Sequence, residues 1–109
     1  MKAKILIIED DPDGRLSVSE AVEAGGHEVV AVENGQRGLD AFRRHGFDAV
    51  LCDLVLPDLN GLDLLGQFRK INDNIPVLIM TAYGTVSTAV TAMRDGAFDY
   101  ILKPLDLND

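Results

Sequence analysis

Short apolar runs recur along the chain and alternate with stretches that carry helix-boundary residues and helical spacing. The first run, Lys4–Ile8, is apolar after Lys4 and is closed by acidic residues. A short bounded run of this kind is typical of a strand buried on both faces of a sheet. Runs of the same type follow at Glu28–Val32, Ala49–Cys52, Val77–Met80 and Tyr100–Leu102. The pattern therefore predicts five strands.

Four helices are predicted between these strands. The first begins near Pro12, whose missing N–H costs little in a first turn, and stops at Gly25-Gly26. We expect Asn34 to cap the second helix and Asn60 to cap the third. The ranges predicted for the last three helices are Gly35–His45, Gly61–Ile71 and Gly84–Asp95.

Helical spacing also predicts which side of a helix faces the core. The expected inner face of the first helix is small and partly polar, with Gly14, Ser17, Val18, Ala21 and Val22. In the third helix, helical spacing relates Leu62, Leu65, Phe68 and Ile71. In the fourth, one stripe carries Val86, Ala89, Val90 and Met93.

Strands that alternate with helices indicate crossover units, and hence an α/β fold with a doubly wound, five-stranded parallel sheet. The 109 residues, 47% of them hydrophobic, suit one domain with a real core. After Lys103-Pro104, Leu105 and Leu107 look like the start of another amphipathic helix. We therefore expect the natural polypeptide to continue, with its last helix truncated in residues 1–109.

Charge and cysteine content narrow the function classes. The net charge of −8 disfavours binding of this domain to nucleic acid or to anionic membranes. No apolar run is long enough to cross a bilayer, and the first residues lack the features of a signal peptide. The single cysteine, Cys52, cannot form an internal disulfide, which suits a reducing cytoplasm.

The candidate chemistry lies at the strand ends, because ligands of open parallel sheets bind outside the carboxyl ends of the strands. The polar residues at those ends are Glu9, Asp10 and Asp11 after the first strand, Asp53 after the third, Thr81 after the fourth and Lys103 after the fifth. Clustered carboxylates repel one another, and their oxygens suit magnesium. His27 and His45 are too far apart in the sequence to suggest a zinc site.

A magnesium ion beside Asp53 would let this anionic carboxylate approach an anionic phosphate, so Asp53 becomes a candidate nucleophile. Lys103 would then pair with one phosphate oxygen, and Thr81 would donate its hydroxyl to another. Each residue alone also has an ordinary interpretation, such as a helix cap for Asp10 or Asp11 or a turn acid for Asp53. The convergence of four elements favours the shared site.

These residues also fall into motifs that resemble the receiver domains of two-component response regulators. The matching segments are Ile7–Asp11, the phosphoacceptor segment Asp53–Gly61, Met80–Ala82 and Tyr100–Pro104. Thr81–Thr85 together with Ala97–Tyr100 further resemble receivers attached to sigma-54-dependent transcription activators. The resemblance implies a flavodoxin-like strand order, 2-1-3-4-5, and a function in phosphorelay signal transduction that regulates transcription.

The resemblance also implies a role for each matching residue. Asp53 is phosphorylated and, with Asp10 and the main-chain oxygen of Val55, ligates Mg²⁺, while Glu9 acts through a metal-bound water. The phosphoryl group is bound by Thr81 and Lys103. The switch residues are Thr81, Tyr100 and Pro104, and the Lys103-Pro104 peptide is expected to be cis. Asp11 extends beyond the usual acidic pair.

The partners implied by the resemblance are a sensor histidine kinase, an effector domain C-terminal to this chain and a second copy in a phosphorylated homodimer. The domain would be a phosphoacceptor that assists its own phosphorylation and dephosphorylation, not an enzyme. Three alternatives stay open. A magnesium-dependent phosphohydrolase usually has an acid where Val55 stands. A flavin or nucleotide carrier needs a Gly- or Ser-rich loop where Glu9-Asp10-Asp11 stand. A degenerate receiver would only bind partners.

Overall fold

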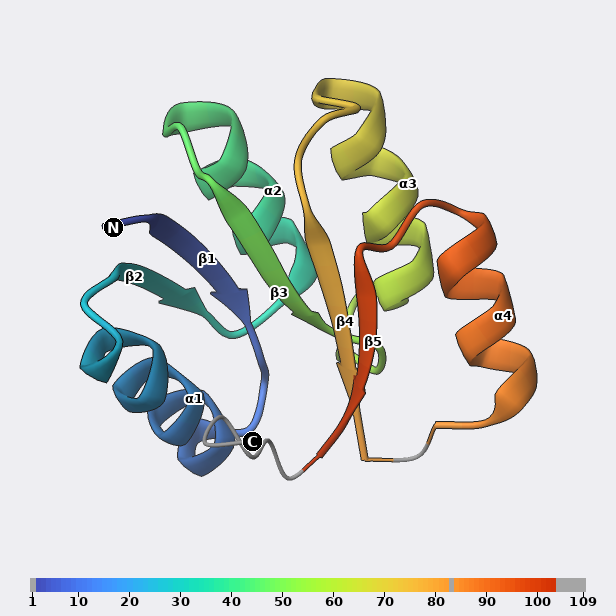
Figure 1. Ribbon diagram of the computed structural model, residues 1–109, viewed down its shortest axis with the longest axis horizontal. Helices are drawn as coiled ribbons and strands as arrows, with labels where there is room; N and C mark the ends of the chain where they lie inside the picture. The colour runs from blue at the N-terminus through green and yellow to red at the C-terminus, as the bar shows by residue number, and fades with distance from the viewer. Residues whose placement is uncertain (1, 83, 104–109) are drawn as a thin grey trace.

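The computed structural model describes residues 2–82 and 84–103. Within them, five strands alternate with four helices (Figure 1). The strands are β1 (Lys4–Ile8), β2 (Glu28–Val32), β3 (Ala49–Asp53), β4 (Val77–Thr81) and β5 (Asp99–Leu102). The helices are α1 (Pro12–Ala24), α2 (Gly35–Arg44), α3 (Gly61–Ile71) and α4 (Val86–Arg94). All strand pairs are parallel, in the order β2-β1-β3-β4-β5, which confirms the predicted fold class.

The helix starts follow from side-chain caps, which supply acceptors for the first backbone N–H groups. Asn34 and Asn60 cap α2 and α3 as predicted, by accepting from the N–H groups of Arg37 and Leu62. The predicted start of the fourth helix is wrong. Helix α4 begins at Val86, because Thr85 and the third helical residue form a reciprocal capping box that ends the preceding loop.

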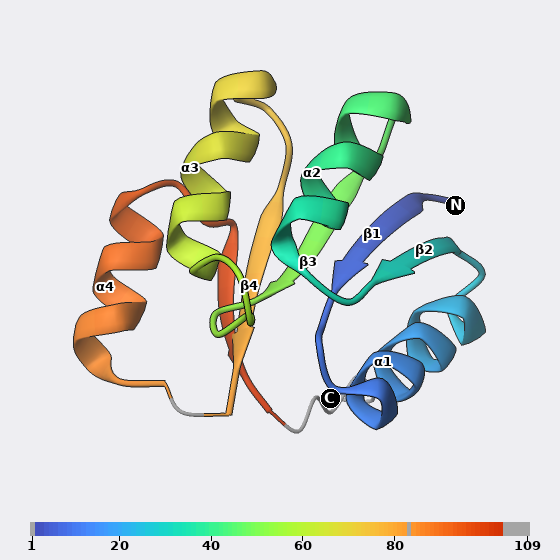
Figure 2. The ribbon, with the colours of Figure 1, turned by 180° about the vertical axis from the view of Figure 1, so that it is seen from behind.

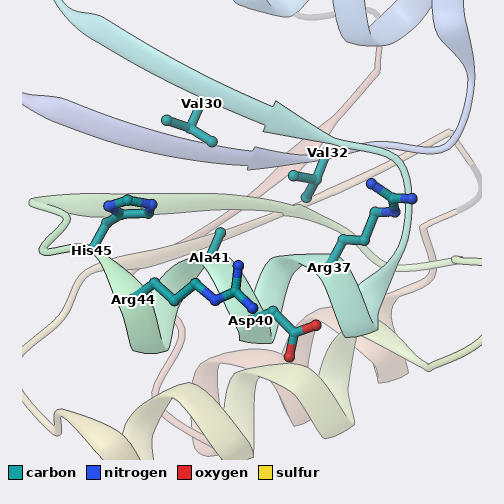
Figure 3. A pocket seen from close by; sticks show the side chains of 7 residues that line it. All are labelled: Val30, Val32, Arg37, Asp40, Ala41, Arg44 and His45. Atoms are coloured by element: carbon teal, nitrogen blue, oxygen red, sulfur yellow. The ribbon is translucent and has the colours of Figure 1, made fainter.

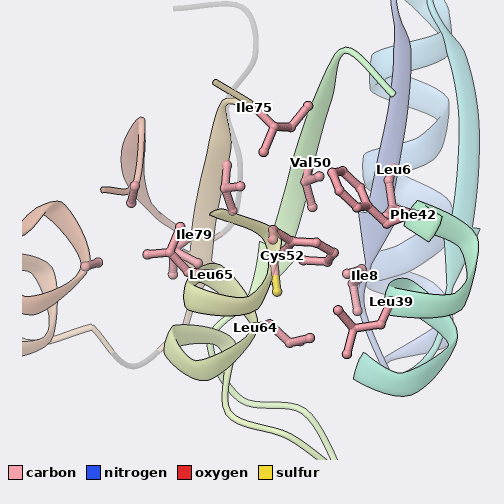
Figure 4. Packing of buried hydrophobic residues seen from close by; sticks show 14 of the residues in the cluster. Leu6, Ile8, Leu39, Phe42, Val50, Cys52, Leu64, Leu65, Ile75 and Ile79 are labelled. Carbon is pink, nitrogen blue, oxygen red and sulfur yellow. The ribbon is translucent and has the colours of Figure 1, made fainter. Parts of the chain in front are cut away.

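Helices cover both faces of the sheet. Helix α1 lies on one face, whereas α2, α3 and α4 lie on the other (Figures 1 and 2). The larger core cluster fills the space under α2 and α3 (Figure 4). Within it, the rings of Phe42 and Phe68 meet with their centroids 4.8 Å apart. The smaller cluster joins α1 to the sheet through Val18, Ile5 and Ile7. No helix of the described residues is long and apolar enough to span a membrane.

The predicted inner face of α1 is only partly right. Val18 is buried and Val22 packs against the core, but Ser17 and Ala21 are exposed. Ser19 is buried in their place, because its hydroxyl donates to the carbonyl of Arg15 at 2.7 Å and so needs no other partner.

The apolar stripe of α4 is mostly exposed. Val86 is 82% exposed, and Val90 and Met93 are about half exposed, while Ala92 is the residue that packs against the core. In α3, Leu64 is buried and Ile71 is exposed. Periodicity shows that a helix has an apolar stripe, but it does not show whether the small or the large side chains face the sheet.

Two further expectations fall outside the described residues. Pro104, with the isomer of its peptide bond, is one of them. The other is the helix predicted to start near Leu105 and Leu107.

Truncation of Phe68 tests the core. Phe68 is fully buried against Phe42, so Phe68→Ala should lower the free energy of unfolding by about 3–5 kcal/mol. The matched control is Phe98→Ala, since Phe98 is 68% exposed and its removal should change stability by less than about 0.5 kcal/mol. Urea unfolding measures both, and equal losses would contradict this packing.

Candidate functional site

Backbone hydrogen bonds continue past the carboxyl ends of the strands and bring their last residues together. The N–H of Glu9 donates to the carbonyl of Val32 at 3.0 Å, and the N–H of Lys103 donates to the carbonyl of Thr81 at 2.8 Å. Asp53 is itself the last residue of β3. Because all strands run parallel, these residues share one edge of the sheet.

A hollow of about 230 Å³ opens at this edge. The residues that line it are Glu9, Asp10, Asp11, Asp53, Val55, Thr81, Ala82 and Lys103. It therefore gathers every predicted metal and phosphoryl residue. Of the predicted switch residues, Thr81 lines the hollow and is buried, Tyr100 does not line it, and Pro104 is not among the described residues.

Lys103 joins two buried carboxylates. Its Nζ donates to Asp53 Oδ2 at 2.8 Å and also to Glu9 Oε1. Burial lowers the pKa of the ammonium, but these two hydrogen bonds and charges outweigh burial and raise the pKa above its usual value. The other Asp53 oxygen, Oδ1, accepts from the N–H of Val55 at 3.2 Å. Lys103 is thus held as a cation against the acids.

Glu9 is the most deeply buried of the acids, with a side chain 1% exposed. Burial raises its pKa to about 7, helped by a hydrogen bond with Asp53 and opposed by Lys103. Its Oε2 atom is buried and has no hydrogen-bond partner among the described residues. A buried acceptor without a partner is costly, so a further donor or cation would stabilise this atom.

The acids fit a divalent cation. Carboxylate oxygens of Glu9, Asp10 and Asp53 lie within 4.8 Å of one another, and Asp10 is exposed at the mouth of the hollow. Once Glu9 has lost its proton, three carboxylates against one ammonium leave a net formal charge of two negative units. Hard oxygen donors with this charge, together with the unpartnered Glu9 oxygen, suit Mg²⁺.

Asp11 lines the hollow but has a different task. Its side chain accepts from the N–H of Gly14 at 2.7 Å and caps α1, which is the ordinary role of an Asp at this position. A Cβ on Gly14 would lie 3.1 Å from Glu9 Oε1 and from Asp11 Oδ2. The small residue thus leaves room for both carboxylates at the start of the helix.

Gly61 at the start of α3 brings the loop after Asp53 into close contact with β3. A Cβ at this position would lie 2.5 Å from the Asp53 carbonyl oxygen. Its N–H also donates to the carbonyl of Leu54 at 2.8 Å. The glycine of the phosphoacceptor motif is therefore required by close approach of two backbones, and any side chain would displace Asp53.

Tyr100 is held toward α4. Its hydroxyl hydrogen-bonds with Thr88 Oγ1 at 2.7 Å. A Cβ on Gly84 would lie 2.8 Å from the same hydroxyl oxygen, so the glycine lets the ring lie close to the loop before α4. Sequence reasoning named Tyr100 but missed Thr88, since a threonine in a helix carries no signal of a tertiary partner.

Two further residues that contact the backbone around the site were not predicted from the sequence. Arg15 on α1 donates to the carbonyl oxygen of Glu9 at 3.0 Å and, more weakly, to that of Asp10 at 3.4 Å. Asp58, in the loop after β3, accepts from two N–H groups of α2. In the sequence, Arg15 looks like an ordinary charged residue on a helix surface, and Asp58, directly after Pro57, looks like an ordinary turn residue. Neither position therefore signals a contact with the site.

A second hollow, of about 410 Å³, lies between β2 and α2 (Figure 3). Val30 and Val32 point from the strand toward the helix, and Arg37 and Arg44 extend from the helix at its rim. Among the described residues that line it, Asp40 is the single acid. It therefore lacks the cluster of carboxylates that marks the first hollow.

Comparison with known families decides the identity of the domain. The family described as response regulator receiver domain matches residues 5–109. The chain belongs to this family. Membership confirms the family that the motifs resembled, and it places the chain in two-component phosphorelay signalling.

The receiver domain is similar to parts of longer transcriptional regulators. It is 44% identical over 106 residues to the response regulator protein FleR from Pseudomonas aeruginosa, covering 97% of this chain and 22% of that protein. It is 38% identical over 105 residues to the transcriptional regulatory protein ZraR from Escherichia coli, covering 96% of this chain and 24% of that protein. The chain thus spans about a quarter of the length of these curated relatives.

Solved structures share the fold. A receiver domain protein from Clostridium thermocellum matches with a TM-score of 0.92 and 34% identity, over 98% of this chain and 86% of that one. NtrX from Brucella abortus, crystallised with ADP, matches with a TM-score of 0.92 and 33% identity, over 99% of this chain and 25% of that one. The strand order of the receiver domain is therefore that of its family.

The reactivity of Cys52 tests whether the residues beneath the site are closed to solvent. Its thiol is fully buried beside Asp53, and burial, with the negative charges of Asp53 and Glu9, raises its pKa far above the usual value. A maleimide should label the native receiver domain at least about a thousandfold more slowly than the urea-unfolded chain. Rapid labelling of the native protein would contradict this burial.

The raised pKa of Glu9 predicts a pH dependence in metal-free protein. The folded state keeps a proton on Glu9 up to about pH 7, whereas the unfolded state releases it near 4.5. The free energy of unfolding should therefore fall as pH rises through this window, by up to about 1.4 kcal/mol per pH unit from this group. Urea unfolding in chelator at pH 5 and 7 measures the fall, and Glu9→Gln should flatten it. An unchanged slope in this variant would contradict the assignment.

Proposed function

We propose that Asp53 accepts a phosphoryl group from the phosphohistidine of a sensor kinase, and that this transfer requires a magnesium ion. The charge balance of the hollow is the observation that carries the proposal. With Glu9 ionised, the carboxylates of Glu9, Asp10 and Asp53 present two more negative charges than Lys103 offsets. A buried Glu9 oxygen also has no partner among the described residues. A divalent cation would complete this arrangement.

The proposed transfer forms one bond and breaks another. A carboxylate oxygen of Asp53 bonds to phosphorus, while the bond between phosphorus and the imidazole nitrogen of the donor breaks. The electron pair of the broken bond stays on the imidazole, which takes up one proton from solvent. Lys103 Nζ, 2.8 Å from Asp53 Oδ2, is placed to pair with an oxygen of the transferred group. We assign the Thr81 hydroxyl to another oxygen.

The metal would be held by Asp10, Asp53 and the main-chain oxygen of Val55, with Glu9 acting through a water. When bound, Mg²⁺ neutralises phosphate oxygens so that an anionic nucleophile can approach. Lys103 supplies the second positive charge, since it is already held against Asp53. The exposed position of Asp10 leaves the metal side of the hollow open to a phosphodonor.

Phosphorylation would switch the domain through Thr81 and Tyr100. The new phosphoryl oxygens attract the Thr81 hydroxyl, and Tyr100 then turns toward the space that Thr81 vacates. Tyr100 must first give up its hydrogen bond to Thr88, which is worth about 1 kcal/mol net. A few kcal/mol of differential binding is enough to shift most of the population, so this bond is a small obstacle.

We further infer the setting of the domain. The relatives are about four times longer than this chain, so an effector domain C-terminal to the receiver domain is proposed, of the sigma-54-dependent transcription activator type. A cytoplasmic location, a cognate histidine kinase and a homodimer of the phosphorylated form belong to the same proposal. The domain is proposed to act as a phosphoacceptor and not as an enzyme.

A magnesium-dependent phosphohydrolase is the less favoured function. Such an enzyme needs a general acid or base beside the nucleophile, typically two residues later. That position is Val55, whose side chain is 62% exposed and cannot carry a proton. Multiple turnover of a phosphomonoester that requires Asp53 would restore this alternative.

Incubation with a small acyl phosphate tests the phosphoacceptor role. With Mg²⁺, the intact mass should rise by one phosphoryl group, and the gain should vanish in chelator and in Asp53→Asn, since the nucleophilic oxygen is lost. Asp73→Asn is the matched control, because Asp73 is exposed and lies before β4, at the opposite edge of the sheet. Phosphorylation that persists in Asp53→Asn would overturn the assignment.

A further inference from the structure

The loop between β3 and α3, residues 54–60, is fastened to a helix that lies next to it in space but far from it in sequence. Asp58 Oδ1 accepts from the N–H of Gly35 at 2.8 Å, and Asp58 Oδ2 accepts from the N–H of Gln36 at 2.9 Å. Both donors are in the first turn of α2. A carboxylate at a helix N-terminus is stabilised by the N–H groups and by the helix dipole.

The cap of α2 itself leaves these two N–H groups for Asp58. Asn34 accepts from the N–H of Arg37 with its side chain and from the N–H of Gly38 with its carbonyl, at 2.8 and 3.1 Å. The remaining N–H groups of the first turn are those of Gly35 and Gln36. Asp58 therefore supplies acceptors that α2 would otherwise take from water.

The pKa of Asp58 agrees with this attachment. Desolvation is the largest single effect and raises the pKa, but the backbone hydrogen bonds, with those from Gln36 and Gly35 first among them, together outweigh it and hold the pKa below its usual value. The carboxylate is thus ionised throughout the range in which the receiver domain would work.

An apolar contact supports the same attachment. Leu59 follows Asp58, and a Cβ on Gly35 would lie 2.8 Å from Leu59 Cδ1. The absence of a side chain at Gly35 thus lets the loop lie directly against the first turn of α2. Asp58 and Leu59 together hold the far end of the loop.

The near end of the same loop lines the site. Val55 lines the hollow, its N–H donates to Asp53 Oδ1, and it pairs with Asn60 across the loop as an isolated antiparallel bridge. The bridge and the Gly61-to-Leu54 hydrogen bond close the loop at its base. A closed loop transmits a displacement of one end to the other, because its backbone has few free torsions.

We propose that Asp58 is a positioning residue for the metal site. Asp58 holds the main chain of Val55 in the place where the Val55 carbonyl oxygen would meet the cation. This inference rests on the proposed magnesium site. Asp58 does not line the hollow, so its effect passes through the backbone of the loop. Groups that orient metal ligands from behind commonly govern metal affinity.

Asp58→Asn tests the inference, because an amide keeps the shape but offers one acceptor and turns an NH₂ group toward the second N–H. The Mg²⁺ dissociation constant, measured by calorimetry on unphosphorylated protein, should rise about tenfold. Asp63→Asn is the matched control, with the same charge change on an exposed acid in the first turn of α3. It should leave the dissociation constant within about twofold, since long-range charge is screened.

A purely stabilising role makes a different prediction. It would lower the free energy of unfolding equally in chelator and in saturating Mg²⁺, and leave the dissociation constant unchanged. A positioning role predicts instead that Asp58→Asn lowers the free energy of unfolding more in saturating Mg²⁺ than in chelator. Amide exchange in chelator should also accelerate at Val55 in Asp58→Asn, besides Gly35 and Gln36, and should not do so in Asp63→Asn.

Asp58→Glu serves as the second variant, since it keeps the charge and moves the carboxylate by one methylene. It should weaken Mg²⁺ binding less than Asp58→Asn does. Wild-type affinity in both folded variants would overturn the positioning role while leaving the proposed function intact. Failure of the wild-type domain to bind Mg²⁺ at all would instead remove the proposed function.

Discussion

The contact of Lys103 with Asp53 and Glu9 is the interaction on which the site depends. Burying Glu9 and Asp53 side by side is unfavourable, because each charge repels the other and water is excluded. Lys103 offsets part of this cost, and its backbone is held by the carbonyl of Thr81. What remains is a group of acids in which one buried oxygen has no partner within the described part of the chain, and such an environment favours a divalent cation.

The scaffold around this contact places strict steric demands on a few positions. Gly61 allows the loop after Asp53 to approach β3, and Gly14 leaves room for Glu9 at the start of α1. On its far side, the loop is held by Asp58, which accepts hydrogen bonds from two N–H groups of α2. Rigid elements thus position the acids. Tyr100, for which we propose a switch role, is half-buried, and its hydroxyl hydrogen-bonds with Thr88 on α4.

The sequence could predict the elements and the acids because both depend on local patterns. Buried strands of a parallel sheet are short apolar runs, and polar residues that follow them must lie at the carboxyl edge. The inner faces of helices were harder to predict. In α4 the large apolar side chains are exposed and Ala92 is buried in the core, and periodicity alone does not reveal which side of the helix faces the sheet.

By itself, the sequence determined the α/β class, the order of elements and the set of residues at the site, because these follow from apolar periodicity, caps and motif spacing. Only the tertiary structure decided which partner each polar group finds. Lys103 contacts two carboxylates at once, and Asp58 binds a helix more than twenty residues away. Such pairings are set by the packing of α2 against the loop and of strands within the sheet, and no local rule of sequence encodes a contact between distant segments.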